Sequence, residues 1–177
     1  MSQLKKSINA LNASITAIGG YVPDERLTNK KLESMVETND QWIQNKTGIK
    51  ERRILSDPSK ATSYLAIKAA NNLITKNDID PKEIEMIILA TATPDMQIAA
   101  TAAYVATKIG ASNAFGYDLQ SACSGFLYAM SMAAGKIESG RYKKILVIGA
   151  DKMSSLINYE DRSTCIIFGD GAGAVLF

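Results

Sequence analysis

The sequence predicts one α/β domain in which helices pack on a mostly parallel or mixed sheet. Strand-like apolar runs alternate with helical patterns along the chain, which is typical of this fold class. The runs at residues 86–90 (MIILA) and 144–149 (KILVIG) are almost wholly apolar, as expected for strands buried on both faces. The 177 residues suffice for one domain with a sizeable core, and no linker or repeat divides them.

The beginning of the chain predicts a strand and two short polar helices. Residues 14–21 (SITAIGGY) form the expected strand, which ends in a glycine turn. Residues 28–36 and 39–46 are the expected helices, each starting at an N-cap residue, and Gly48 closes the second. Residues 51–60 are predicted to be a charged loop.

The remaining elements follow from apolar residues at helical spacing and from short apolar runs bounded by turn residues. In chain order they are a helix at 63–75, a loop at 78–85, a strand at 86–90, a helix at 101–109, a strand at 114–119, a helix at 124–139, a strand at 144–149, and strands at 165–168 and 172–177 joined by the turn 169–171. The chain stops on apolar residues 175–177, so we expect either a fragment or a strand edge that a partner chain covers.

Composition excludes several functional classes. Lys plus Arg is 20 and Asp plus Glu is 18, and the net charge of +2 offers no electrostatic surface for nucleic acid. No apolar run approaches the ~18 residues of a membrane span. Polar residues interrupt the N-terminal segment, so no secretory or transit sequence is expected there.

The chain contains two cysteines and no histidine. The cysteines form no Cys-x-x-Cys motif, so a reducing compartment is expected rather than a disulfide framework. The lack of histidine removes most zinc sites, Ser-His-Asp triads and Cys-His dyads from this chain. No metal site is predicted.

Cys123 is the candidate nucleophile. It stands between an apolar strand and a long helix, so its thiol is predicted to lie at a strand-to-helix turn. The free N–H groups and the dipole at a helix N-terminus favour an anion there, and small neighbours leave the sulfur accessible. The alternative is a buried structural cysteine, the commoner fate of a lone cysteine. Position alone does not decide between the two.

Other candidates are better explained structurally. Cys165 lies in an apolar run and is predicted to be a core residue. The glycine-rich residues 169–174 lack the following helix of a dinucleotide-binding loop, so we interpret them as a tight turn.

Aromatic and cationic residues could serve a nucleotide-bearing ligand. Trp42, Lys46, Arg52 and Arg53 combine an indole with three cations, which suits a phosphate-bearing nucleotide such as coenzyme A. A half-buried tryptophan beside solvated charges explains them equally simply and is favoured. Arg162 and the preceding aspartate would form a surface ion pair by the same reasoning.

Five motifs together resemble the β-ketoacyl-acyl carrier protein synthase III family. They are TNDQWI at 38–43, TGIKER at 47–52, DLQSACSGF at 118–126, DRST at 161–164 and FGDGAGA at 168–174. The resemblance runs from about residue 15 to the end of the chain. It implies a thiolase-like fold and places residues 1–177 in the N-terminal half of a condensing enzyme, as one βαβαβαββ unit with a mixed five-stranded sheet.

The resemblance also implies a role for several residues. Cys123 matches the nucleophile that takes the acetyl group from acetyl-CoA. Trp42 and Arg162 match the pair that sandwiches the adenine of coenzyme A, and Thr38 matches a residue near that adenine. Lys46 stands where an arginine is common, so a bidentate phosphate contact becomes a point charge.

Two departures from the family pattern limit what is implied. Residues 97–99 (QIA) replace an aromatic–proline pair, which leaves the acyl-chain preference open. The family's His and Asn for decarboxylation belong to a second half that is absent from this sequence. The chain alone is therefore expected to be inactive, and the Cys123 N–H is the main part of the oxyanion hole that remains.

The implied activity is an acyltransferase that condenses acetyl-CoA with malonyl-acyl carrier protein and so starts type II fatty acid biosynthesis. A homodimer without metal or redox cofactor, in the cytoplasm or the plastid stroma, is expected. The alternatives are another condensing enzyme, such as a polyketide starter synthase or a hydroxymethylglutaryl-CoA synthase, and a non-catalytic half-domain that pairs with another chain.

Overall fold

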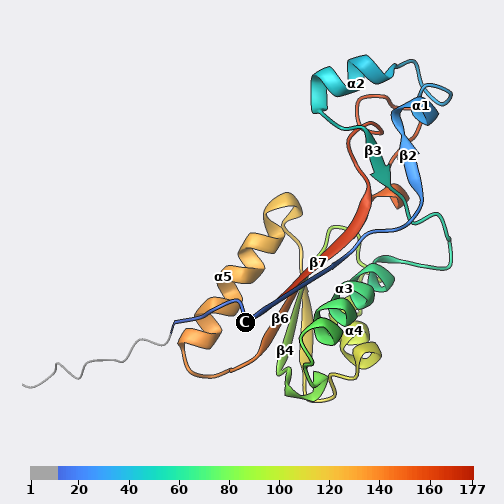
Figure 1. Ribbon diagram of the computed structural model, residues 1–177. Coiled ribbons are helices and arrows are strands. Elements are labelled where there is room, and N and C mark those ends of the chain that lie inside the picture. The colour runs from blue at the N-terminus through green and yellow to red at the C-terminus, as the bar shows by residue number, and fades with distance from the viewer. Residues whose placement is uncertain (1–11) are drawn as a thin grey trace, which may run out of the picture.

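The computed structural model describes residues 12–177, and its main body is a five-stranded sheet in the order β1-β7-β6-β4-β5 (Figure 1). β4 is parallel to β5 and β6, whereas β7 is antiparallel to β1 and β6. The sheet is therefore mixed, as predicted. The strands are β1 (Ala17–Tyr21), β4 (Met86–Ala90), β5 (Phe115–Leu119), β6 (Ile145–Lys152) and β7 (Asp170–Leu176). The N-terminal segment in which no targeting signal is expected falls largely outside the described residues.

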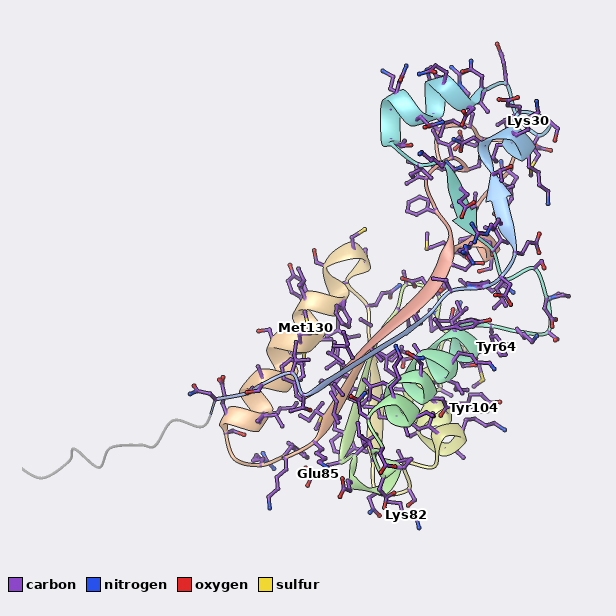
Figure 2. The ribbon with its side chains drawn as sticks, viewed as in Figure 1. Lys30, Tyr64, Lys82, Glu85, Tyr104 and Met130 are labelled. Carbon is purple, nitrogen blue, oxygen red and sulfur yellow. The ribbon has the colours of Figure 1, made fainter. Side chains whose placement is uncertain are left out.

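Helices cover both faces of the sheet. They are α3 (Thr62–Lys76) and α4 (Thr101–Ile109) on one face and α5 (Gly125–Glu138) on the other. One apolar cluster lies under α3 and α4 and includes Leu73 and Val105. A second lies under α5, where Met130 turns toward the sheet (Figure 2). The predicted βαβαβαββ order is confirmed. Within residues 12–177, every helix is too short or too polar to cross a membrane.

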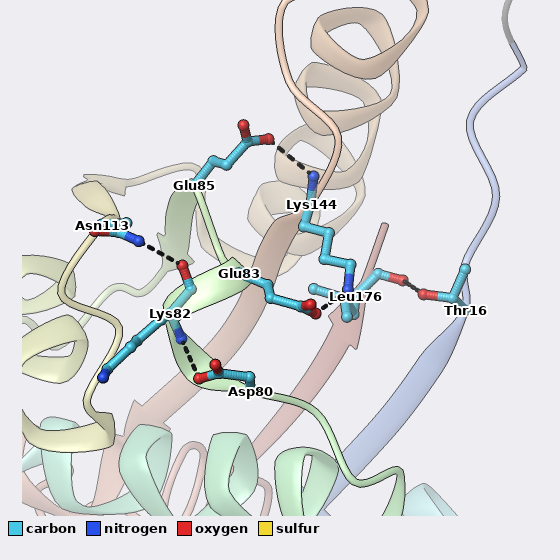
Figure 3. Close-up of polar contacts among 8 residues, drawn as sticks. All are labelled: Thr16, Asp80, Lys82, Glu83, Glu85, Asn113, Lys144 and Leu176. Atoms are coloured by element: carbon cyan, nitrogen blue, oxygen red, sulfur yellow. Dashed lines mark hydrogen bonds and ion pairs between the residues drawn. The ribbon is translucent and has the colours of Figure 1, made fainter.

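The central strand β4 shows why the sequence pattern predicts this fold. All five of its residues are buried, because helices cover it from both sides. Polar contacts then hold its amino end in place (Figure 3). The carboxylate of Glu85 accepts a hydrogen bond from the N–H of Lys144 at 3.1 Å, and Asn113 Nδ2 donates to the carbonyl of Lys82 at 2.8 Å. These contacts join the starts of β4, β5 and β6, so the carboxyl ends of the three parallel strands share one edge.

A small unit is inserted between β1 and α3. It consists of β2 (Arg26–Thr28), α1 (Asn29–Leu32), α2 (Asp40–Thr47) and β3 (Glu51–Arg53). The predicted caps are confirmed, since Asn39 Oδ1 accepts from the N–H of Trp42 at 2.8 Å and Gly48 ends α2 with φ 73°. That positive φ suits glycine because it has no Cβ.

Two predictions in this unit are wrong. Residues 51–60 begin with strand β3, paired antiparallel with β2, rather than forming a loop throughout. The first helix ends at Leu32 instead of continuing to residue 36. The hydroxyl of Ser34 donates to the carbonyl of Lys31 at 2.7 Å, a local bond that competes with helix propagation.

The predicted strand at 165–168 does not form. This segment consists of turns, in which the N–H of Cys165 donates to the carbonyl of Asp161 at 3.1 Å. The predicted turn at 169–171 is also wrong, because β7 already begins at Asp170. Gly169 lies against β3, where a Cβ would come within 3.0 Å of the carbonyl oxygen of Arg53. Tertiary packing therefore overrides the β propensity of the apolar run.

The end of the chain is not an exposed edge. β7 lies between β1 and β6, and the N–H and C=O of Phe177 both bond to Ile145, at 2.9 and 3.0 Å. Of the two alternatives expected for residues 175–177, the strand edge that a partner chain covers is therefore wrong, whereas the alternative of a fragment does not depend on such an edge. The described sheet ends instead at β1 on one side and β5 on the other. Three 3₁₀ helices complete the part of the chain from residue 12 onward: η1 (Pro81–Glu83), η2 (Ala122–Ser124) and η3 (Met153–Ser155).

Candidate active site

Cys123 lies at the predicted strand-to-helix turn. β5 ends at Leu119, Cys123 is the central residue of η2, and α5 begins two residues later. Ala122 has φ 43°, a conformation that residues with a Cβ seldom adopt, so the chain turns sharply just before the thiol. The cysteine is free and exposed. The turn presents its sulfur outside the core, at the N-terminal end of α5.

Cys165 is the opposite case. It is 1% exposed and belongs to the apolar cluster of the small unit. Burial raises the pKa of its thiol. The prediction that Cys165 is a core residue is confirmed.

Trp42 and Arg162 lie in contact although they are far apart in the sequence. The guanidinium carbon of Arg162 is 5.2 Å from the centroid of the Trp42 ring, within cation–π distance. Arg162 also donates to the carbonyl of Glu37 at 3.0 Å. The carboxylate of Asp161 instead accepts from Ser163 and Thr164, so the predicted Asp161–Arg162 ion pair does not form within residues 12–177.

Thr38 precedes α2, the helix of Trp42, and Lys46 lies in its last turn. The hydroxyl oxygen of Thr38 is buried and has no hydrogen-bond partner in the described part of the chain. A buried polar atom left unpaired costs free energy, and a ligand could supply its partner. Lys46 follows Trp42 by four positions on α2 and is exposed, so the two side chains share one helix face.

Arg52 and Arg53 do not belong to a phosphate-binding cluster. Arg52 is 4% exposed, and its guanidinium donates to Asn29 Oδ1 and to the carbonyl of Ile166. Arg53 donates to the carbonyl of Pro23 at 2.8 Å. Neither the nucleotide hypothesis nor the picture of solvated charges fits Arg52, because its charge is buried.

Two cavities lie at the carboxyl end of β4, of about 670 and 370 Å³, and both are lined by Pro94, Gln97 and Gln120. Ligands of open α/β sheets bind at this edge. Sequence analysis did not single out Gln120, although it directly follows β5. It also missed Tyr117, whose hydroxyl is buried without a partner inside the described region and whose pKa burial raises.

The site falls into two parts at one end of the sheet. The N-terminal end of α5, which carries Cys123, points toward the end of the molecule where the small unit with α2 lies (Figure 1). No group of three His, Cys, Asp or Glu side chains among residues 12–177 could hold a metal ion. The arrangement combines an accessible thiol with an aromatic–cation pair, which suits acyl transfer from a thioester with a flat, anionic carrier.

Comparison with known proteins identifies similar chains. A family model described as 3-oxoacyl-[acyl-carrier-protein] synthase III matches residues 117–177. The β-ketoacyl-[acyl-carrier-protein] synthase III of Phocaeicola vulgatus is 54% identical over 166 residues, which cover 94% of this chain and 50% of that protein. The chain thus spans about half the length of the curated relatives it matches.

Solved structures agree with the fold. The 3-oxoacyl-[acyl-carrier-protein] synthase III of Aquifex aeolicus superposes with a TM-score of 0.88 at 45% identity, over 92% of this chain and 52% of that one. The priming β-ketosynthase from the R1128 polyketide pathway gives 0.87 at 33% identity, over 92% and 48%. The thiolase-like fold predicted from the motifs is confirmed.

Proposed function

Since this chain corresponds to the N-terminal half of a β-ketoacyl-acyl carrier protein synthase III, we propose that it supplies the nucleophile and the nucleotide-binding wall of such an enzyme. The complete enzyme would condense acetyl-CoA with malonyl-acyl carrier protein to acetoacetyl-acyl carrier protein, the starting step of type II fatty acid biosynthesis. The observation that carries the proposal is the exposed Cys123 at the sharp turn between β5 and α5.

The proposed reaction has two steps. The Cys123 thiolate attacks the acetyl carbonyl carbon, the bond to the sulfur of coenzyme A breaks, and the released coenzyme A thiolate takes up a proton. Malonyl-acyl carrier protein then loses carbon dioxide, its carbanion attacks the acetyl-cysteine, and the Cys123 thiolate is released. The backbone N–H of Cys123 would stabilise the oxyanion in both steps. Both are thioester carbonyl chemistry, so the proposal includes no metal or redox cofactor.

In the same proposal, Trp42 and Arg162 bind the adenine of coenzyme A, Thr38 offers its unpaired hydroxyl to it, and Lys46 meets a phosphate. The open edge of β5, which pairs only with β4 within the described sheet, is where a second copy would complete a homodimer. The relatives are bacterial, which favours the cytoplasm, or the stroma if the chain is plastid-encoded.

The function is tested by incubating the complete enzyme with acetyl-CoA and malonyl-acyl carrier protein and identifying the product by mass spectrometry. We expect acetoacetyl-acyl carrier protein and one carbon dioxide per turnover. Absence of the product with an enzyme shown to be folded would refute the proposal.

A polyketide starter synthase is the second candidate, because the R1128 priming enzyme superposes with a TM-score of 0.87. Gln97 and Ile98 line the cavity beside Gln120, and they stand at the position where the family resemblance leaves the acyl-chain preference open. Competition between acetyl-CoA and longer acyl-CoA substrates distinguishes the two. A clear preference for a longer chain would favour the starter synthase.

Replacing Trp42 with alanine should weaken acetyl-CoA binding. An aromatic platform under a nucleobase contributes about 1–3 kcal/mol. The ring is half-buried against the apolar cluster of the small unit, so a modest fall in melting temperature should accompany the loss. Isothermal titration and thermal melts measure both effects, and Trp42→Phe should retain most of the packing and part of the binding. A large loss of melting temperature with unchanged binding would assign Trp42 to the core.

A further inference from the structure

Arg52 is a buried cation without a carboxylate partner. Its side chain emerges from the middle of β3 and is 4% exposed, and no Asp or Glu of residues 12–177 forms an ion pair with it. Its donors go to neutral oxygens, the side-chain amide of Asn29 and the carbonyl of Ile166. Burying a guanidinium is costly unless its donors are satisfied, and a hydrophobic residue often fills such a place at less cost. The arrangement therefore calls for an explanation other than stability.

Through Asn29, the guanidinium of Arg52 is connected by hydrogen bonds to α2, the helix that carries Trp42. Asn29, which accepts from Arg52, donates through its Nδ2 to Asp40 Oδ1 at 2.8 Å and to the carbonyl of Ile49 at 2.7 Å. Asp40 is the first residue of α2, and Ile49 follows the glycine that ends it. Asn29 therefore bonds to both ends of α2, and its hydrogen bond with Arg52 links the position of α2 to that of the guanidinium.

The guanidinium of Arg52 is also hydrogen-bonded to the segment that carries Arg162. Both Nε and Nη2 of Arg52 donate to the carbonyl of Ile166. Ile166 is 4% exposed and lies in the run of turns 162–167, whose backbone is held by the bond from the N–H of Cys165 to the carbonyl of Asp161. Arg162 lies within this run of turns, so Arg52 fixes the backbone from which the side chain of Arg162 extends.

We infer that Arg52 is a positioning residue that sets the spacing between Trp42 and Arg162, and through it the affinity for the nucleotide part of the acyl donor. The inference rests on the proposed function. In the structure the two side chains are in contact at 5.2 Å, so a flat ring must separate them while they stay face to face. The guanidinium of Arg52 connects the two segments, because it bonds directly to the carbonyl of Ile166 and reaches both ends of α2 through the side chain of Asn29.

This role predicts a specific kinetic signature. The nucleotide lies away from the reacting thioester, so its contacts should be equally strong in the ground state and the transition state. A change in the spacing between Trp42 and Arg162 should then raise KM for acetyl-CoA and leave kcat nearly unchanged. An acetyl donor without a nucleotide, such as S-acetyl-pantetheine, has no group to place between Trp42 and Arg162, and its kcat/KM should not change.

The experiment measures Arg52→Gln and Arg52→Lys in the complete enzyme with acetyl-CoA and with S-acetyl-pantetheine, below the melting temperature of each variant. Lysine keeps the charge but cannot bond to Asn29 and Ile166 with a planar fork. We expect both variants to raise KM for acetyl-CoA by about tenfold, as for the loss of charge-assisted hydrogen bonds. Arg53→Gln is the matched control, because Arg53 is the next residue on β3 and bonds to Pro23 instead. It should leave both donors unaffected.

Each outcome either supports or refutes the positioning role of Arg52. A selective loss with acetyl-CoA, absent from Arg53→Gln, supports the inference. An equal loss with both donors, or a lower melting temperature with unchanged KM for acetyl-CoA, shows that Arg52 only stabilises the fold. If the unmodified enzyme transfers acetyl from neither donor, the proposed function fails, and this result is distinct from a failure of the role of Arg52.

Discussion

Replacing Cys123 with serine in the complete enzyme is expected to lower the rate of acetyl transfer by roughly 10³-fold or more. A thiolate is available near neutral pH, whereas a serine hydroxyl needs a general base. The side chain at this exposed turn is nearly isosteric after the change, so the fold should be retained.

Intact-protein and peptide mass spectrometry after incubation with isotopically labelled acetyl-CoA measures this effect. One acetyl group should appear on the peptide that contains Cys123, and none on that of the buried Cys165. Cys165→Ala serves as the control, because it removes the second thiol and should leave labelling intact. Label on Cys165, or undiminished labelling of Cys123→Ser, would overturn the assignment of the nucleophile.

The second large effect concerns the 177 residues expressed alone, which are expected to self-associate or aggregate. α5 packs one side against the sheet and leaves Leu127, Tyr128 and Met132 exposed at 63%, 54% and 43%. In β1 of the same sheet, the side chain of Ile18 is 68% exposed. Large apolar side chains exposed in this number are typical of a contact surface. We expect the second half of the enzyme to cover it.

Analytical ultracentrifugation and binding of a hydrophobic dye test this expectation. The double change Leu127→Lys and Met132→Glu should reduce dye binding and association of the isolated chain, while preventing assembly of the complete enzyme. Tyr104→Lys is the matched control, because Tyr104 is an exposed aromatic residue on α4, on the opposite face of the sheet (Figure 2). A monomer with a sharp two-state melt and no dye binding would mean that this half is self-sufficient.

Local sequence patterns predicted the elements whose environment is the same along their whole length. The bounds of β4 and α4 are as predicted, because β4 is buried on both faces and α4 ends at Gly110. Cys123 could be placed for the same reason, since the strand before it and the helix after it are both recognisable from a few neighbouring residues. The five family motifs added the thiolase-like fold and its mixed five-stranded sheet, whereas the order of the strands in that sheet came only from the structure.

Pairings between distant residues could not be predicted in this way. β2 and β3 have three residues each, too few for a hydrophobic alternation, and they exist because they pair with each other. The apolar run at 165–168 has the composition of a strand, yet its burial comes from packing against the small unit as a series of turns.

The sequence by itself therefore determined the α/β class, the order of the main elements, the turn that carries Cys123 and the core position of Cys165. The family resemblance already implied that Trp42 and Arg162 form a pair, and the structure places them in contact. Only the tertiary structure decided that Arg52 is buried rather than solvated. The physical reason is that periodicity and capping act between residues a few positions apart. The partners that satisfy the guanidinium of Arg52, by contrast, are 23 and 114 positions away, and only folding brings them within hydrogen-bond distance.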